Sequence, residues 1–237
     1  MKTETLLTEG IETLMKDAEI ERLVAPRHDE IISLLTRYLK EIELFNPAYK
    51  LVGTNDSEEL VVKHILDSLA PLGIISRLLN EARAEGRPQI ADAGSGAGLP
   101  GIPLAIAMPD CDFTLIERMG RRAGFLCGAK AVLALSNITV EEGELEKTSA
   151  ERYALVTFRA FKPLEPKLFK TLLRVCAEGG VIAAYRGRRE KTEAELSALK
   201  GICGKWEIIP CAVPFLDEER HLLIIRTDEI KKSGNSL

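Results

Sequence analysis

Hydrophobic positions divide the chain into a helical first third and an alternating remainder. Ile31, Leu35 and Ile42 recur at the spacing of one helical face. The segment 45–47, Phe-Asn-Pro, is expected to break this helix, because proline removes a backbone donor. A further helix is expected from about Ser57, where acidic residues follow and suit the positive end of a helix dipole. Residues 1–80 are therefore predicted to form a helical extension packed on the rest of the chain.

From residue 88 onward, short apolar segments alternate with helical ones. The expected strands are residues 90–93, 113–116, 138–140, 155–158, 181–185, 206–209 and 222–225. Helices are expected between the first six, as in 121–135 and 166–176, and this alternation is typical of a parallel sheet covered on both faces. The segment 210–220 is too short for a crossover helix, so the last two strands are expected to pair antiparallel.

These elements predict an α/β, Rossmann-like fold. It has a seven-stranded, mostly parallel sheet with one antiparallel strand and an N-terminal helical extension. The core is expected over residues 88–228, and residues 229–237 read as a frayed tail.

A glycine-rich loop follows the first expected strand and opens a helix. It runs Ala91-Asp92-Ala93-Gly94-Ser95-Gly96-Ala97-Gly98-Leu99-Pro100-Gly101. Open parallel sheets bind ligands at this position, and glycine lets the backbone approach a ligand closely. Glu117 ends the next strand, where a carboxylate can accept hydrogen bonds from the two hydroxyls of a ribose. Dinucleotides and S-adenosyl-L-methionine both carry such a ribose.

The loop itself favours one of these ligands. Its glycines are spaced G-x-G-x-G, whereas dinucleotide sites want G-x-G-x-x-G. Asp92, two residues before the first glycine, would repel a pyrophosphate at the mouth of the loop but suits the amino and sulfonium groups of S-adenosylmethionine. We therefore favour S-adenosylmethionine over a dinucleotide, with a ligand-free glycine turn as a further alternative.

Composition excludes several other classes. Hydrophobic residues make up 46% and charged residues 29%, as in ordinary globular proteins. No apolar run approaches the roughly 20 residues of a membrane span, and residues 1–22 lack the order of a signal peptide. The five cysteines contain no C-x-x-C pair, and the three histidines show no metal-ligand spacing. We expect a cytoplasmic protein without a metal or a membrane partner.

Four segments together carry a family resemblance. They are the loop 91–106, Val62-Lys63-His64-Ile65-Leu66-Asp67-Ser68-Leu69, Gly120-Arg121-Arg122-Ala123-Gly124-Phe125-Leu126 and Arg159-Ala160-Phe161. From about residue 45 to 226, the chain resembles the bacterial 16S rRNA guanine-N7 methyltransferases, the glucose-inhibited division protein B family. The resemblance implies a class I methyltransferase fold with S-adenosyl-L-methionine as cofactor. It also implies a guanine of 16S rRNA as substrate, in free rRNA or in a 30S ribosomal particle. We expect a monomer.

The resemblance also implies site residues. The cofactor contacts that it implies are Gly94, Leu99, Glu117, Leu145, Glu146 and Arg159, and the loop itself adds Asp92, Gly96 and Gly98 as predicted contacts. Arg159 matches a family arginine near the methionine end of the cofactor and the target base. His64 and Asp67 lie three residues apart, so they share one helical face. That face either supports the helix or borders the active-site mouth, and we name both residues with Arg159 as catalytic candidates. The chain departs from the family pattern at Phe158, which replaces a serine, and at Glu144, where a basic residue is common.

The expected chemistry asks little of the protein. Guanine N7 offers a lone pair with no proton to remove, so no general base or covalent nucleophile is required. Catalysis would rest mostly on holding N7 in line with the methyl group. Arg159 is predicted to orient the base or the cofactor carboxylate.

Charge is unevenly distributed along the chain. Taken over the whole chain, the net charge of −4 argues against a nucleic-acid partner. However, residues 159–191 carry nine Lys and Arg against three Glu, a net charge of +6, which leaves −10 for the remainder. The predicted RNA-binding residues are Arg121, Arg122, Arg186, Arg188 and Arg189. Tyr185 is either a stacking platform for a base or a buried strand end. A small-molecule methyltransferase and a dinucleotide-binding protein remain the alternatives.

Overall fold

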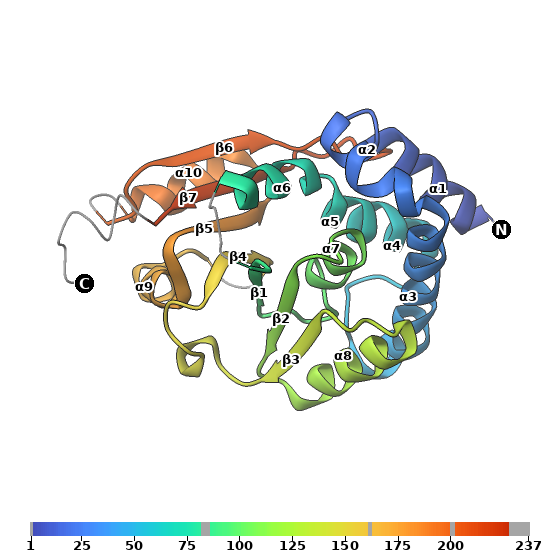
Figure 1. The fold of residues 1–237 in the computed structure, drawn as a ribbon, viewed down its shortest axis with the longest axis horizontal. Coiled ribbons are helices and arrows are strands. Elements are labelled where there is room, and N and C mark those ends of the chain that lie inside the picture. The colour runs from blue at the N-terminus through green and yellow to red at the C-terminus, as the bar shows by residue number, and fades with distance from the viewer. Residues whose placement is uncertain (1, 82–85, 161–162, 200–201, 228–237) are drawn as a thin grey trace.

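The computed structural model describes residues 2–81, 86–160, 163–199 and 202–227. Seven strands form one sheet in the order β3-β2-β1-β4-β5-β7-β6 (Figure 1). They are β1 Gln89–Ala93, β2 Asp112–Glu117, β3 Ile138–Glu142, β4 Tyr153–Arg159, β5 Cys176–Arg186, β6 Trp206–Pro210 and β7 His221–Arg226. All seven strands predicted from the hydrophobic pattern are confirmed. The predicted tail, residues 229–237, lies outside the described residues.

The sheet is parallel apart from one strand. β1 to β5 pair in parallel, and β7 runs antiparallel to both of its neighbours, β5 and β6. The predicted antiparallel pairing of the last two strands is confirmed. Because β7 inserts beside β5, His221 at its start lies opposite Arg186 at the end of β5. The sheet topology therefore brings the chain near residue 220 to the edge where the glycine loop lies.

Helices precede β1 throughout the described part of residues 2–81. They are α1 Lys2–Leu14, α2 Ala18–Val24, a 3₁₀ turn Ala25–Arg27, α3 His28–Tyr49, α4 Ser57–Leu60, a π-helical turn Val61–Leu66, α5 Asp67–Leu69 and α6 Leu72–Glu81. Asp56 caps α4 by accepting a hydrogen bond from the Glu59 amide at 2.7 Å. The predicted helix start at Ser57 is confirmed.

The expected break at 45–47 is wrong, because α3 continues to Tyr49 with Pro47 inside its last turn. A proline there removes only one helical hydrogen bond. The helix ends at Lys50, which has a left-handed backbone conformation. The buried Asn46 side chain then holds the following turn, donating to the Thr54 carbonyl at 2.7 Å and accepting from the Val52 amide at 2.9 Å. The Asn-Pro pair therefore shapes the exit from the helix.

Helices cover both faces of the sheet. α7 Gly101–Ala107 and α8 Gly120–Leu133 lie on one face together with the N-terminal helices, and α9 Pro166–Val175 and α10 Arg189–Ser197 lie on the other. Between β3 and β4 the structure has only a 3₁₀ turn, Leu145–Lys147, so the helix expected there is wrong. The ten residues between β3 and β4 must pass from the sheet edge across two strands, which leaves no length for a crossover helix.

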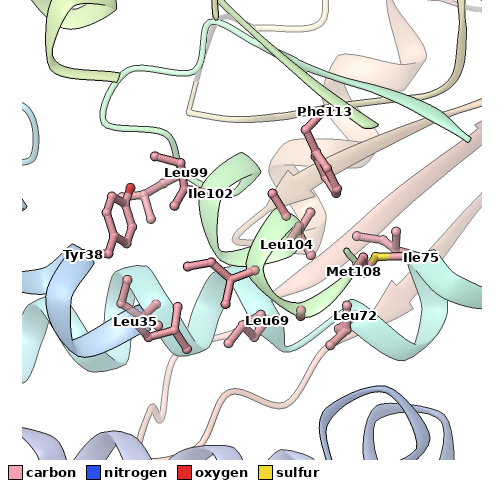
Figure 2. Packing of buried hydrophobic residues seen from close by; sticks show 14 of the residues in the cluster. Leu35, Tyr38, Leu69, Leu72, Ile75, Leu99, Ile102, Leu104, Met108 and Phe113 are labelled. Carbon is pink, nitrogen blue, oxygen red and sulfur yellow. The ribbon is translucent and has the colours of Figure 1, made fainter. Parts of the chain in front are cut away.

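The N-terminal helices pack directly on α7 (Figure 2). The residues in this contact layer are Leu35, Tyr38, Leu69, Leu72, Ile75, Leu99, Ile102, Leu104 and Met108. Tyr38 is fully buried, and its hydroxyl donates to the Ala97 carbonyl in the glycine loop at 2.5 Å. The extension therefore supports the loop from behind.

Candidate active site

Two carboxylates hold the glycine loop. Asp92 is completely buried, and its Oδ2 accepts hydrogen bonds from Ser95 Oγ at 2.6 Å and from the Gly101 amide at 3.0 Å. Burial raises the pKa of Asp92 to about 6. The expected position of this carboxylate at the loop mouth is wrong, since it bonds to the loop from within. Its contact with a cofactor stays a prediction.

Glu117 holds the loop from its other side. Its carboxylate accepts from the Gly96 amide and from the Met119 amide, both at 2.9 Å, and the side chain is almost entirely buried. Glu117 lines a cavity of about 210 Å³ together with Gly94, Leu145 and Glu146. The structure thus brings four of the predicted cofactor-binding residues to one small cavity.

A larger cavity of about 830 Å³ adjoins the first. Gly94, Arg122 and Ala160 line both of them, so the two spaces meet at the glycine loop. Gly96 and Leu99 also line the larger cavity. Gly98 lines neither cavity. Its φ is +90°, and a Cβ there would lie 2.5 Å from Ile102 Cδ1, so the chain needs glycine at this position for packing.

The three catalytic candidates meet in the larger cavity. Arg159, at the end of β4, donates from Nη1 to Asp67 Oδ2 at 2.7 Å and to the Lys63 carbonyl at 2.9 Å. Its Nη2 lies 3.0 Å from His64 Nδ1. His64 lies in the π-helical turn and Asp67 directly after it, so the side chains three residues apart both reach the same guanidinium. Burial and the neighbouring Arg159 lower the pKa of His64 to about 4.

The predicted RNA-binding arginines fall into different environments. Arg188 is exposed and lines the larger cavity. Arg122 lines both cavities and donates to the Lys50 carbonyl at 3.1 Å. Arg121 is exposed and lines neither of these two cavities. Arg189 is exposed on α10 and pairs with Glu193 at 2.8 Å, outside the cavity.

Arg186 is not the free surface charge that its sequence context suggested. Its side chain is only 11% exposed, it lies 3.2 Å from Glu195 Oε2, and its guanidinium stacks over the Phe158 ring at 5.1 Å. Phe158, the departure from the family serine, is therefore the support for this arginine. Tyr185 is a buried strand end, since its hydroxyl donates to the Ser68 carbonyl at 2.7 Å. Of the two interpretations of Tyr185, the structure supports the buried strand end, and the residue also lines the larger cavity.

Sequence reasoning missed Arg220, which also lines the larger cavity. Its Nε lies 3.3 Å from Asp67 Oδ1, so Asp67 contacts two guanidinium groups. Lys63 was missed as well, and its ammonium pairs with Glu59 at 3.0 Å and with Glu218 at 3.1 Å. No local motif marks Arg220, because only the insertion of β7 beside β5 brings it to the site.

The larger cavity is strongly basic. Its lining contains seven Lys and Arg side chains against three Asp and Glu. The basic residues are Lys63, Arg122, Arg159, Arg186, Arg188, Lys191 and Arg220. A protein with a net charge of −4 thus concentrates positive charge where its glycine loop opens. Such a cavity favours an anionic partner.

The comparisons with known proteins agree with this geometry. Residues 31–223 match the family model GidB, described as rRNA small subunit methyltransferase G. The chain belongs to this family. It is 38% identical to the ribosomal RNA small subunit methyltransferase G of Treponema denticola, over 93% of this chain and 95% of the relative. It is 41% identical to the protein of the same name from Treponema pallidum, over 83% and 86% of the two chains.

Solved structures confirm the fold. The tRNA (m1A58) methyltransferase TrmI of Aquifex aeolicus superposes with a TM-score of 0.53 at 11% identity, over 67% of this chain and 68% of that one. A predicted O-methyltransferase of Agrobacterium tumefaciens gives 0.50 at 23% identity, over 63% and 78%. The predicted Rossmann-like methyltransferase fold is therefore confirmed.

Within the part of the chain that the structure describes, no helix combines the length and apolarity needed to cross a bilayer. The same residues hold no cluster of three or more His, Cys, Asp or Glu side chains able to bind a metal ion.

Proposed function

We propose that this chain transfers a methyl group from S-adenosylmethionine to N7 of a guanine in small-subunit rRNA. One observation carries the proposal. The small cavity beside the glycine loop and Glu117 shares the lining residues Gly94, Arg122 and Ala160 with a larger, basic cavity that Arg159 also lines. A cofactor held in the first can therefore present its reactive end to an RNA nucleotide held in the second. Family membership supports rRNA as the substrate.

The residues present fit the cofactor. Gly94 and Gly96 both have positive φ, and a Cβ at Gly96 would approach only the Gly94 carbonyl oxygen, at 3.9 Å, so the loop surface is open for close approach. Glu117, Leu145 and Glu146 would hold the adenosine end. S-adenosylmethionine supplies an electrophilic methyl group when it is bound. The G-x-G-x-G spacing of the loop disfavours a dinucleotide, whose sites use G-x-G-x-x-G.

The protein's own contribution is positioning. N7 carries a lone pair and no proton, so none of the residues needs to act as a base. Arg159 is fixed by Asp67 and by the Lys63 carbonyl, which suits a group that orients the base or the cofactor carboxylate. Holding the reacting groups in one orientation would lower the entropic part of the activation barrier.

The RNA partner is proposed from the charge of the larger cavity. Its four excess positive charges match a phosphate backbone. We propose 16S rRNA, free or within a 30S particle, as the substrate, and a monomeric protein acting in the cytoplasm. A small-molecule methyltransferase would not need a basic opening of this kind.

The test is methylation of rRNA and 30S particles from cells that lack the gene, followed by mapping of the modified nucleotide. We expect one N7-methylated guanine. Methylation of small molecules alone, or a melting temperature raised by NAD and not by S-adenosylhomocysteine, would overturn the proposal.

Arg188→Gln and Arg189→Gln form a matched pair for RNA binding, because both side chains are exposed and only Arg188 lines the cavity. Arg188→Gln should weaken RNA binding and lower its salt slope by about one, with little effect of Arg189→Gln. Equal effects of the two substitutions would place the RNA elsewhere.

A further inference from the structure

Arg159 fixes which nitrogen of His64 carries a proton. Arg159 Nη2 lies 3.0 Å from His64 Nδ1. A guanidinium has only donors, so Nδ1 must accept with its lone pair. A neutral imidazole then carries its proton on Nε2. Burial and the neighbouring guanidinium keep the ring neutral, since they lower the pKa of His64 to about 4.

The backbone at His64 is also held in place. Ser68 Oγ donates to the His64 carbonyl at 2.6 Å, and Tyr185 donates to the Ser68 carbonyl at 2.7 Å. His64 lies in the π-helical turn Val61–Leu66, an irregularity that occurs frequently at functional sites. Its side chain lines the larger cavity, and none of the described residues provides a hydrogen-bond partner for Nε2. His64 therefore offers one oriented N–H donor.

Four of the seven cationic side chains that line the cavity are paired with acids. Lys63 pairs with Glu59 and Glu218, Arg186 pairs with Glu195, and Arg159 and Arg220 share Asp67, whereas no carboxylate among the described residues contacts His64 Nε2.

Purines differ at the edge that carries N7. Guanine presents O6, an acceptor, beside N7, whereas adenine presents an amino group, a donor. A fixed donor next to the reacting nitrogen therefore accepts guanine and rejects adenine, because adenine would leave two donors facing each other. We propose that His64 Nε2–H donates to O6 of the target guanine and selects that base. This inference rests on the proposed function of the site.

The experiment compares two RNAs, one with guanine and one with 2-aminopurine at the target position. 2-Aminopurine keeps N7 but lacks O6. The comparison uses the wild-type protein, His64→Gln and His64→Asn. Glutamine places an amide donor near the position of Nε2. Asparagine can accept from Arg159 in place of Nδ1 but is too short to donate into the cavity. For each protein, kcat/KM for the guanine RNA is divided by kcat/KM for the 2-aminopurine RNA. Comparing this ratio between proteins cancels the difference in intrinsic reactivity of the two bases.

We expect His64→Asn to lower the guanine to 2-aminopurine ratio by about tenfold relative to the wild type, and His64→Gln to retain most of it. If His64→Asn keeps the wild-type ratio while methylating guanine, His64 only positions Arg159 and the inference is overturned. Binding of S-adenosylhomocysteine, measured by the rise in Tm, shows that each variant is folded. If one variant is unfolded, the other still tests the inference. A folded His64→Asn protein with the wild-type guanine to 2-aminopurine ratio contradicts it, and so does a folded His64→Gln protein that has lost this ratio. Failure of the wild-type protein to methylate the guanine RNA would count against the proposed function instead.

Discussion

Replacing Asp67 with asparagine removes a carboxylate that lies against two guanidinium groups. Arg159 Nη1 is 2.7 Å from one carboxylate oxygen and Arg220 Nε is 3.3 Å from the other. At an effective dielectric constant of about 20, each pair attracts by roughly 5–6 kcal/mol before the desolvation of the charges is counted. The Asp67 side chain is 9% exposed, so water replaces little of the lost interaction.

The net loss in the free energy of unfolding is smaller than this attraction. Breaking a buried ion pair typically costs about 3–5 kcal/mol. Asparagine keeps one acceptor for Arg159, and Arg220 retains Glu218 at 2.9 Å. We therefore expect Asp67→Asn to lose about 2–3 kcal/mol, which lowers Tm by roughly 5–10 °C for a chain of this size.

Thermal and denaturant unfolding monitored by circular dichroism measure this loss. Glu193→Gln is the matched control, because it removes one carboxylate from an exposed pair with Arg189 and should change stability by less than about 0.5 kcal/mol. In the double variant Asp67→Asn/Arg220→Gln, the loss should be smaller than the sum of the single losses by about 1 kcal/mol, since one repelling charge is gone. An Asp67→Asn protein as stable as the control would refute the shared-carboxylate interpretation.

Three further predictions concern the loop and the histidine. Tyr38→Phe removes the hydroxyl that donates to Ala97, so S-adenosylhomocysteine should bind about fivefold more weakly in calorimetry, and unchanged affinity would show that the extension does not support the loop. Glu117→Gln can accept from the Gly96 amide or from the Met119 amide but not from both, so the ligand-induced rise in Tm should largely disappear, and a rise of wild-type size would contradict this. The pKa of His64 is 6.5 in the unfolded chain and about 4 in the folded protein. Between pH 6.5 and pH 4 the unfolded chain therefore binds more protons, so His64 lowers the free energy of unfolding as the pH falls through this range. His64→Gln should therefore gain stability relative to the wild type as the pH is lowered from 6.5 to 4. If the free energies of unfolding of the two proteins keep a constant difference across this pH range, a neutral buried histidine is excluded.

The strands could be predicted from the sequence because their signal is local. Each apolar segment after residue 88 is short, bounded by polar residues and separated from the next, so all seven are recognisable. The break at Pro47 was mispredicted for the same reason. A local rule for proline carries no information about the Asn46 side chain, which bonds to residues six to nine positions later and shapes the turn after the helix.

The site residues likewise divide into those with a local sequence signal and those that only the tertiary structure brings to the site. The glycine loop and Glu117 have a recognisable spacing, and His64, Asp67 and Arg159 came from the family resemblance. Arg220 comes to the site only through the order of strands, because β7 lies between β5 and β6. Arg186 was misplaced because a basic residue beside other basic residues reads as surface, whereas Phe158 and Glu195 hold its side chain in the cavity wall.

The cations that line the larger cavity include two groups, a first tier that is paired with acids and a second tier without acidic partners, and the two groups can contribute differently. Arg159, Arg186 and Arg220 each face an acid, so their charges are largely neutralised and their geometry is fixed. Arg188 and Lys191 line the same cavity, and no carboxylate among the described residues pairs with either. Only unneutralised charges displace counterions from RNA, so the second tier should set the salt dependence of binding. The first tier should instead set the orientation of the bound base, and its loss should lower kcat more than RNA affinity. A net charge of −4 is compatible with RNA binding because Arg188 and Lys191, without acidic partners among the described residues, line the larger cavity.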